Sequence, residues 1–145
     1  MKLSSFATRR SRGFTLIELL VVLVILGMLA GLVGPRLFSN VDKSKVKTAD
    51  TQVKMLRGSL QTYRLDVGSY PNTEQGLAAL MHKPTDVANW QGPYLEDELP
   101  KDPWNNPYVY KSPVVNLQGF ALYSQGADGK PGGDGLDAEV GYLEK

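Results

Sequence analysis

A long apolar run near the N-terminus contains a single charged side chain, Glu18. No charged residue lies between Leu19 and Pro35, and the run from Phe14 to Pro35 is 22 residues long. At 1.5 Å per residue it forms a helix of roughly 33 Å, which is long enough to cross a bilayer. A carboxylate in hydrocarbon costs several kcal/mol unless a partner compensates it, so Glu18 is a candidate functional residue. Since the run itself contains no cation, we expect this partner to come from outside it.

The 13 residues that precede Phe14 are basic and contain no acid. Their cations are Lys2, Arg9, Arg10 and Arg12. Cleavage between Gly13 and Phe14 would create a free amine at Phe14, which supplies the cation that Glu18 lacks. A standard secretory signal is cleaved after its apolar region, whereas the distinctive junction here lies before it. The alternative is an uncleaved basic flank that anchors a single-pass helix.

The junction Gly13–Glu18, which reads GFTLIE between basic residues and an apolar helix, closely resembles the class III leader of type IV pilins and type II secretion pseudopilins. The resemblance implies that a membrane-embedded prepilin peptidase cuts between Gly13 and Phe14 and methylates the new N-terminal phenylalanine. It further implies that Glu18 pairs with the Phe14 amine of a neighbouring subunit. This pairing would set the register of the helices in a filament.

Composition argues against nucleic-acid binding and against catalysis. The chain carries a formal charge of +1, and without the four leader cations it carries about −3, whereas nucleic-acid binders have a basic excess. His82 is the one histidine, there is no cysteine, and no P-loop pattern is present. About 110 residues follow the apolar run, close to the usual size of one domain. We therefore expect one small globular domain that is not an enzyme.

Seven apolar residues recur at spacings of three and four and predict that the helix continues beyond the membrane. They are Val46, Ala49, Val53, Leu56, Leu60, Tyr63 and Val67. We expect this stripe to be buried against its own domain rather than in a coiled coil, and Gly68 to end the helix. Pro35 interrupts the hydrogen-bond ladder and should kink the helix. Small residues at Gly27, Gly31 and Gly34 suit close packing between helices in an assembly.

Beyond Gly68 the sequence predicts short elements separated by proline and glycine. Residues 73–81 are expected to form a second helix, with Asn72 or Thr73 as its N-cap. Residues 108–111 and 120–124 are rich in aromatic and β-branched side chains and are expected to form antiparallel strands.

A glycine-rich loop at residues 124–139 contains a cluster of carboxylates. The acidic residues are Asp128, Asp134, Asp137 and Glu139. Calcium binds six to eight hard oxygen atoms from carboxylates and backbone carbonyls, and glycines allow the tight turns that direct carbonyls inward. The spacing is not that of an EF-hand. From composition alone, a plain acidic turn explains the loop at least as well as a calcium site.

A second, more specific resemblance extends from Gly13 to about Val140. The segments YRLDVGSYPNTEQGLAAL, GPYL, LPKDPWNNPYVY and SQGADGKPGGDGLDAEV occur in the order found in the major pseudopilins of type II secretion systems. The resemblance implies a calcium ion held by Asp128 and by the backbone carbonyls of Gln125 and Lys130. An aspartate of the family pattern is displaced here, so either Asp134 or Asp137 is the further ligand. Glu139 is a weaker candidate.

Together these features predict an α+β, pilin-like fold: a long N-terminal helix packed on a small antiparallel sheet, with a C-terminal calcium loop. The expected organisation is a cleaved leader at 1–13, a transmembrane and assembly helix at 14–38, and a periplasmic domain at 39–145 that includes the second half of the helix at about 39–67. Assembly is expected to depend on Phe14, Glu18 and Pro35.

The resemblance implies that the chain is a structural subunit of the type II secretion pseudopilus, which polymerises in the periplasm to drive protein export across the outer membrane. The implied partners are further copies of itself, minor pseudopilins, the inner-membrane assembly platform, the prepilin peptidase and membrane lipid. Two alternatives stay open: a type IV pilin of a surface fibre, and a membrane-tethered calcium-binding module that never polymerises. The lack of a C-terminal cysteine pair and the presence of GADGKPGG favour the pseudopilin.

Overall fold

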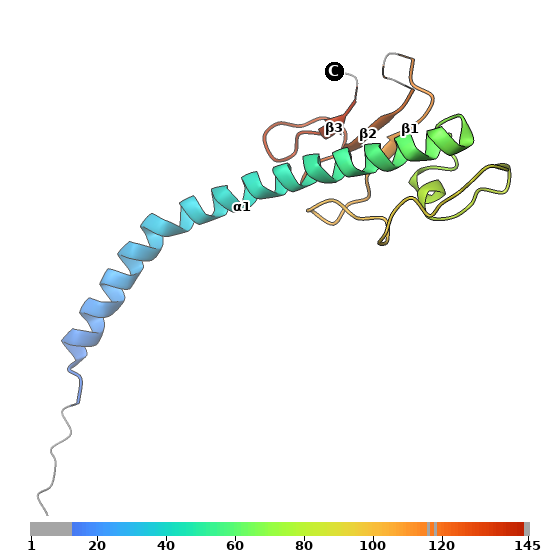
Figure 1. Ribbon diagram of the computed structural model, residues 1–145. Coiled ribbons are helices and arrows are strands. Elements are labelled where there is room, and N and C mark those ends of the chain that lie inside the picture. The colour runs from blue at the N-terminus through green and yellow to red at the C-terminus, as the bar shows by residue number, and fades with distance from the viewer. Residues whose placement is uncertain (1–12, 116, 118, 144–145) are drawn as a thin grey trace, which may run out of the picture. The chain divides into compact units, whose positions relative to one another are not determined.

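The computed structural model describes residues 13–115, 117 and 119–143. The chain divides into two units, Met1–Ser39 and Asn40–Lys145. One helix, α1 (Leu16–Val67), extends through both and contains Pro35 (Figure 1). The proline therefore does not end the helix, and the kink expected there stays a prediction. Most of the leader lies outside the described residues.

The second half of α1 buries the apolar stripe that the sequence predicts. Its five central residues are almost completely shielded from solvent, and the outer two, Val46 and Val67, are half-buried. The helix ends where expected, because Gly68 adopts a left-handed φ of 94° and its N–H donates to the Arg64 carbonyl at 2.8 Å. A glycine reaches this conformation without steric cost, so it terminates helices readily.

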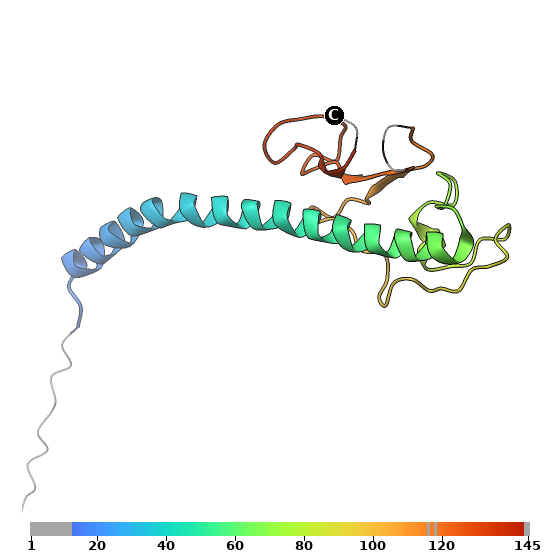
Figure 2. The same ribbon diagram turned by 45° about the horizontal axis from the view of Figure 1, so that its top comes forward.

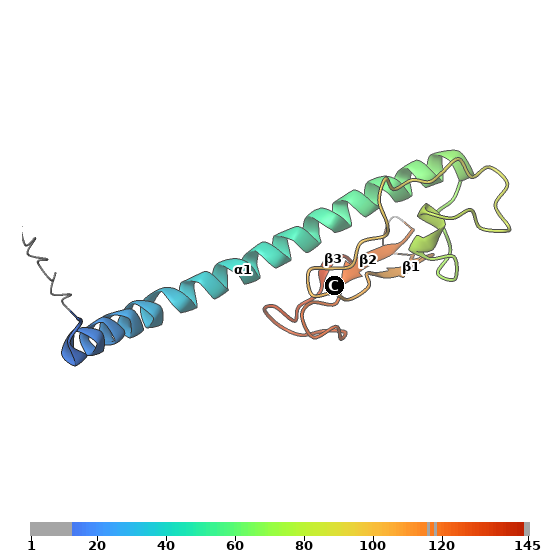
Figure 3. The ribbon, with the colours of Figure 1, turned by 90° about the horizontal axis from the view of Figure 1, so that it is seen from below.

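Three short strands form an antiparallel sheet in the order β1-β2-β3. They are β1 (Val109–Lys111), β2 (Ala121–Ser124) and β3 (Val140–Tyr142). All of β2 is buried, and Leu122 joins Leu56 and Leu60 of α1 in one hydrophobic core. The sheet accordingly lies along the second half of α1 (Figure 3), and residues 82–106 follow another side of the same helix (Figure 2).

Two sequence predictions need correction. The second helix is only a single 3-10 turn, η1 (Leu77–Leu80), and turns occupy residues 73–76. Gly76 has a φ of 57°, which no α-helix contains, and Thr73 exchanges hydrogen bonds with Ser112 instead of capping a helix. The sequence also gave no indication of β3. The two strands that it did predict, at 108–111 and 120–124, pair as expected.

Tyr110 in β1 connects the sheet to the segment that follows α1. Its hydroxyl is buried and donates to the Pro71 carbonyl at 2.7 Å. Burial raises the pKa of Tyr110 from 10 to about 12, with smaller contributions from nearby Tyr63 and Tyr70.

We therefore expect this domain to lose stability in strongly alkaline solution. Below pH 10 the side chain of Tyr110 is protonated in both states, so its contribution to stability is fully present. Between pH 10 and 12 only the unfolded chain loses the proton, which favours unfolding by about 2–3 kcal/mol. Urea unfolding across this range measures the effect. Burial also raises the pKa of Tyr108, which contributes over the same range, so Tyr110→Phe should make the profile less steep without removing the slope. An equally steep profile in the variant would contradict the assignment.

Candidate functional sites

Glu18 forms a capping box at the start of α1. Its Oε2 accepts hydrogen bonds from the backbone N–H of Thr15 at 2.9 Å and from the Thr15 hydroxyl at 3.0 Å. In return, the N–H of Glu18 donates to the Thr15 hydroxyl at 3.3 Å. The expectation that Glu18 has no partner within its own segment was therefore incomplete, because Thr15 supplies two neutral donors. The T-x-x-E spacing is a recognised signal of this box and would have predicted it.

The capping box does not supply a positive charge to Glu18. Phe14, whose amine the sequence proposes as the cation, lies just before the helix with its side chain 83% exposed. Apart from the neighbours of Gly13 in the chain, no atom of the described residues lies within 4 Å of the position that a Cβ on Gly13 would occupy. The predicted junction is thus sterically open, and the charge partner of Glu18 stays a proposal.

The apolar part of α1 has almost no cover from the described part of the chain. From Leu16 to Val33 each large apolar side chain is at least 47% exposed. This part of α1 is long and apolar enough to cross a membrane. Gly27 and Gly31 have open space around them, so another helix can approach the backbone closely here. Exposure of this extent requires lipid or other helices as surroundings.

The C-terminal loop is attached to the sheet through a buried carboxylate, Asp102, which the sequence analysis did not single out. Asp102 is 4% exposed and accepts hydrogen bonds from the N–H groups of Trp104 and Asn106 and from the Ser124 hydroxyl. The Asn106 side chain in turn donates to the Gly126 carbonyl at 3.2 Å. The D-P-W-N order is typical of an Asx turn and is a signal from which Asp102 could have been found.

We expect Asp102→Ala to destabilise the domain strongly. The substitution leaves the buried Ser124 hydroxyl and two part-buried N–H groups, those of Trp104 and Asn106, without their acceptor. A fully buried donor that loses its acceptor costs about 1–3 kcal/mol, and a part-buried one costs less, so the free energy of unfolding should fall by about 2–3 kcal/mol, measured by urea unfolding of the detergent-purified chain. The exposed carboxylate of Asp97 provides the control, because Asp97→Ala should change stability by less than about 0.5 kcal/mol. Equal stability of the two variants would contradict the anchoring role of Asp102.

The loop itself consists of two acidic turns that are hydrogen-bonded to each other. One turn occupies residues 126–129 and the other lies around residues 134–137, and the Ala127 N–H donates to the Leu136 carbonyl at 2.9 Å. Gly126 and Gly133 both have positive φ, and a Cβ on either would lie 2.7 Å from the Asp137 carbonyl oxygen. These glycines are required because the backbone of the second turn passes directly over them.

The proposed calcium ligands are brought into these two turns but do not form a carboxylate cluster. Asp128 accepts a hydrogen bond from the Lys130 N–H at 3.0 Å, and Gln125 directly precedes the same turn. Asp134 and Asp137 lie in the second turn, where the Asp137 N–H donates to the Asp134 carbonyl at 3.2 Å. Within the described residues, no three His, Cys, Asp or Glu side chains are grouped to hold a metal.

The donor atoms of the loop nevertheless fit calcium in their chemistry. They are carboxylate and carbonyl oxygens in tight glycine turns, which calcium prefers. Glu139 is already engaged within the loop, because its Oε1 accepts a hydrogen bond from the Gly132 N–H at 3.2 Å. It therefore stays the weakest of the candidate ligands.

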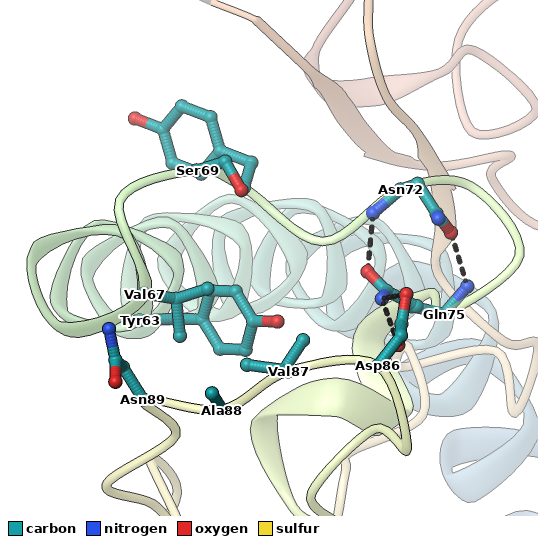
Figure 4. Close-up of a pocket in the computed structure, with 10 residues that line it drawn as sticks. Tyr63, Val67, Ser69, Asn72, Gln75, Asp86, Val87, Ala88 and Asn89 are labelled. Carbon is teal, nitrogen blue, oxygen red and sulfur yellow. Dashed lines mark hydrogen bonds between the residues drawn. The ribbon is translucent and has the colours of Figure 1, made fainter.

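A pocket of about 450 Å³ lies at the C-terminal end of α1 (Figure 4). It is lined by Tyr63, Val67, Ser69, Tyr70, Asn72, Gln75, Asp86, Val87, Ala88 and Asn89. Asn72 and Gln75 exchange backbone-to-side-chain hydrogen bonds, and the Gln75 amide also donates to Asp86 at 2.9 Å. Asn72, Gln75 and Asp86 thus satisfy one another in Figure 4 and join the 84–90 loop to the segment that follows α1, and we assign the pocket no ligand.

Comparison with known families decides the identity of the chain. Residues 36–143 match the family model described as Type II secretion system (T2SS), protein G, and residues 8–34 match the Prokaryotic N-terminal methylation motif. The chain belongs to the type II secretion system protein G family. Relatives named Type II secretion system core protein G support this over nearly the whole length. The relative from Pseudomonas aeruginosa is 48% identical over 136 residues, which covers 92% of this chain and 95% of the relative. The relative from Vibrio cholerae is 44% identical over the same length, with 92% of each chain covered.

A solved structure also confirms the pilin-like fold of this protein G family member. The crystal structure of the major pseudopilin from the type 2 secretion system of enterohaemorrhagic Escherichia coli aligns with a TM-score of 0.61 and 34% identity. The alignment covers 72% of this chain and 87% of the other. The predicted architecture, a long helix with a small antiparallel sheet, is therefore confirmed, whereas calcium binding by the loop is not tested by this likeness.

Proposed function

We propose that the protein is the structural subunit of a periplasmic pseudopilus, which polymerises through its N-terminal helix to drive protein export. The observation that carries this proposal is the uncovered apolar half of α1, joined to a compact domain with a core of its own. Lipid surrounds the segment Leu19–Val33 in the stored monomer, and neighbouring helices replace lipid in the filament. No catalytic step is required of the subunit.

The same proposal assigns the location and the partners. The leader directs the chain to the inner membrane, with the globular domain in the periplasm, and the prepilin peptidase processes it there. The filament contains further copies of this chain together with minor pseudopilins, and it grows from the inner-membrane assembly platform.

Electron microscopy of cells that overproduce the chain with its secretion genes tests this function. Short filaments that react with an antibody against the globular domain are the expected result. Filaments that extend far from the surface without any effect on secretion would favour a type IV pilin instead. A processed, membrane-bound chain that never forms filaments would favour the tethered calcium-binding module.

We further propose that calcium closes the loop at residues 124–139. A ligand that binds only the native state stabilises it by RT ln(1 + [L]/Kd), about 2.7 kcal/mol at a hundredfold excess over Kd. Without the ion, the carboxylates of the two turns repel one another and the loop opens over the strands that it joins. The ligands proposed are Asp128, the carbonyls of Gln125 and Lys130, and one of Asp134 and Asp137.

Thermal unfolding of the detergent-purified chain in calcium and in chelator measures this contribution. We expect calcium at a hundredfold excess over Kd to raise the melting temperature by about 10 °C, as about 2.7 kcal/mol does in a domain of this size. In both solutions, the Asp128→Ala variant should melt at the temperature that the unsubstituted chain shows in chelator. The same result for Asp134→Ala or Asp137→Ala identifies the further ligand. Asp97→Ala is the matched control and should keep the full shift. Equal melting of the unsubstituted chain in both solutions would show an ordinary acidic turn.

A further inference from the structure

The exposed face of α1 in the globular unit carries an uncharged stripe. Its members recur at spacings of four and three residues and are all exposed: Thr51, Met55, Gly58, Thr62 and Leu65. We call this set the open stripe. It lies opposite the buried stripe that contains Leu56 and Leu60, since successive residues turn by about 100° around a helix. Leu65 is 84% exposed and Met55 is 49% exposed, so the described part of the chain does not cover this face.

One flank of the open stripe is basic. Lys54, Arg57 and Arg64 lie along it and form what we call the basic row. The guanidinium of Arg57 is held 4.2 Å from the ring centre of Tyr142. Its Nε is buried, and no described group accepts a hydrogen bond from it. The single ion pair among the described residues joins Lys54 to Asp50 at 2.7 Å, so no carboxylate of the described residues pairs with Arg57.

The other flank is acidic. Glu96, Asp97 and Glu98 are consecutive and exposed, and we call them the acidic loop. A cleft of about 320 Å³ separates this loop from Met55 and Ser59 of α1. Figure 2 shows the chain segment that contains this loop following α1 on a side different from that of the sheet.

Arg57 and the acidic loop lie on different sides of α1 and cannot pair within one molecule. Arg57 is two residues from Met55 and two residues from Ser59, which places it about 200° around the helix from both. Arg57 therefore faces the sheet side, under Tyr142, while the acidic loop lies over the opposite side of α1. Each copy thus presents two complementary charged surfaces in different directions.

We propose that Arg57 of one copy and the acidic loop of the next copy form a head-to-tail contact across the open stripe. The proposal rests on the proposed polymerisation and names the contact that orders the globular domains. Because the contact uses two different patches, each bound copy still presents one free patch, and repetition produces an open helical filament rather than a closed dimer. Charge complementarity fixes the register and disfavours the reverse orientation.

Gly58 at the centre of the open stripe supports a close approach. Outside the helix's own backbone, no atom of the described residues lies within 4 Å of the position that its Cβ would occupy, so the described fold does not need a glycine there. A glycine inside an exposed helix is less favourable than alanine. In the proposed contact, the bare backbone at Gly58 lets the neighbouring loop lie directly against α1.

Crosslinking of the full chain tests the geometry, because the natural sequence has no cysteine. Gln61→Cys lies one turn from Arg57, and Asp97→Cys lies in the acidic loop, so both substitutions keep the other charges of the contact. A chain with both cysteines, treated in filament-forming cells with a short bis-maleimide, should give a ladder of dimers, trimers and longer species. Each single variant should stay monomeric, and the two expressed together should stop at dimers. Replacing Gln61→Cys by Lys83→Cys in the double variant should abolish the ladder.

Charge reversal tests the energetics in the same cells. Two charge reversals are made separately. One is Arg57→Glu, and the other combines Glu96→Lys, Asp97→Lys and Glu98→Lys. Each should reduce the number of filaments about tenfold, a ratio that corresponds to about 1.4 kcal/mol. Combining the two sets in one chain should restore most of the loss, since the pair re-forms with reversed signs. Thermal unfolding of the purified chains shows whether each variant is folded, and a folded combined chain that is no better than the single sets would overturn the contact.

The outcomes separate this contact from the proposed function. Visible filaments without a crosslinked ladder overturn the contact and leave polymerisation intact. Dimers from either single cysteine variant also overturn it, because they indicate a two-fold contact. If the unsubstituted chain forms no filaments, the proposed function fails and the contact fails with it.

Discussion

Glu18→Gln is expected to abolish filaments and the export of a secreted reporter, while the chain still inserts and is still processed. The substitution removes the negative charge that we propose to pair with the Phe14 amine of a neighbouring copy. Insertion should not suffer, because a neutral side chain is cheaper to place in the membrane than a carboxylate. Immunoblots of membrane fractions, electron microscopy and a secretion assay measure the three steps separately.

The capping box provides the control for this experiment. A glutamine at position 18 can still accept hydrogen bonds from Thr15. Thr15→Ala, in contrast, removes the hydroxyl of the capping box and keeps the Glu18 carboxylate. If Glu18 acts in assembly, Thr15→Ala should form filaments and Glu18→Gln should not. If Glu18 serves only to start the helix, Thr15→Ala should be the more damaging change. Normal filaments from the Glu18→Gln variant would show that the carboxylate does not set the register of the helices.

The helix was predictable from sequence because its signal is local and repeated. Seven residues at helical spacing define a buried face, and Gly68 and its φ of 94° end the helix as expected. The 3-10 turn shows the opposite case. Thr73 has the right chemistry for an N-cap, but its backbone N–H and its hydroxyl are both engaged by Ser112, 39 residues away. A long-range contact of this kind overrides local propensity, and no window of sequence around Thr73 contains it.

The third strand was missed for a related reason. It has three residues, and the central one is Gly141, which is depleted in strands. A Cβ at Gly141 would lie 2.6 Å from the Leu122 carbonyl oxygen, so the close approach to β2 requires glycine. The same holds for the C-terminal loop, where the sequence pointed to the carboxylates only as a group. Which of them face one another depends on the packing of Gly126 and Gly133 on the second turn, and spacing alone does not determine it.

Replacing Gly13 by arginine is expected to leave the precursor uncut and to prevent assembly completely. The proposed peptidase must accept the residue before the scissile bond, and a bulky charged side chain at this position is excluded from a site that admits glycine. Without cleavage there is no amine at Phe14, so the proposed partner of Glu18 is never formed. Intact-mass measurement of the membrane-extracted chain checks this directly. The unsubstituted protein should begin at Phe14 with one added methyl group, whereas the variant should keep Met1.

Gly13→Ala is the matched control for the cleavage experiment. Within the described residues, nothing beyond its chain neighbours lies near the Cβ position of Gly13, so a methyl group there does not disturb this part of the chain and cleavage should proceed. An unsubstituted chain that keeps Met1 in cells with an active prepilin peptidase would refute the cleavage and remove the proposed partner of Glu18. Filaments built from uncleaved Gly13→Arg subunits would have a different meaning. They would show that the basic leader is compatible with helix packing and that the Phe14 amine is not needed for it.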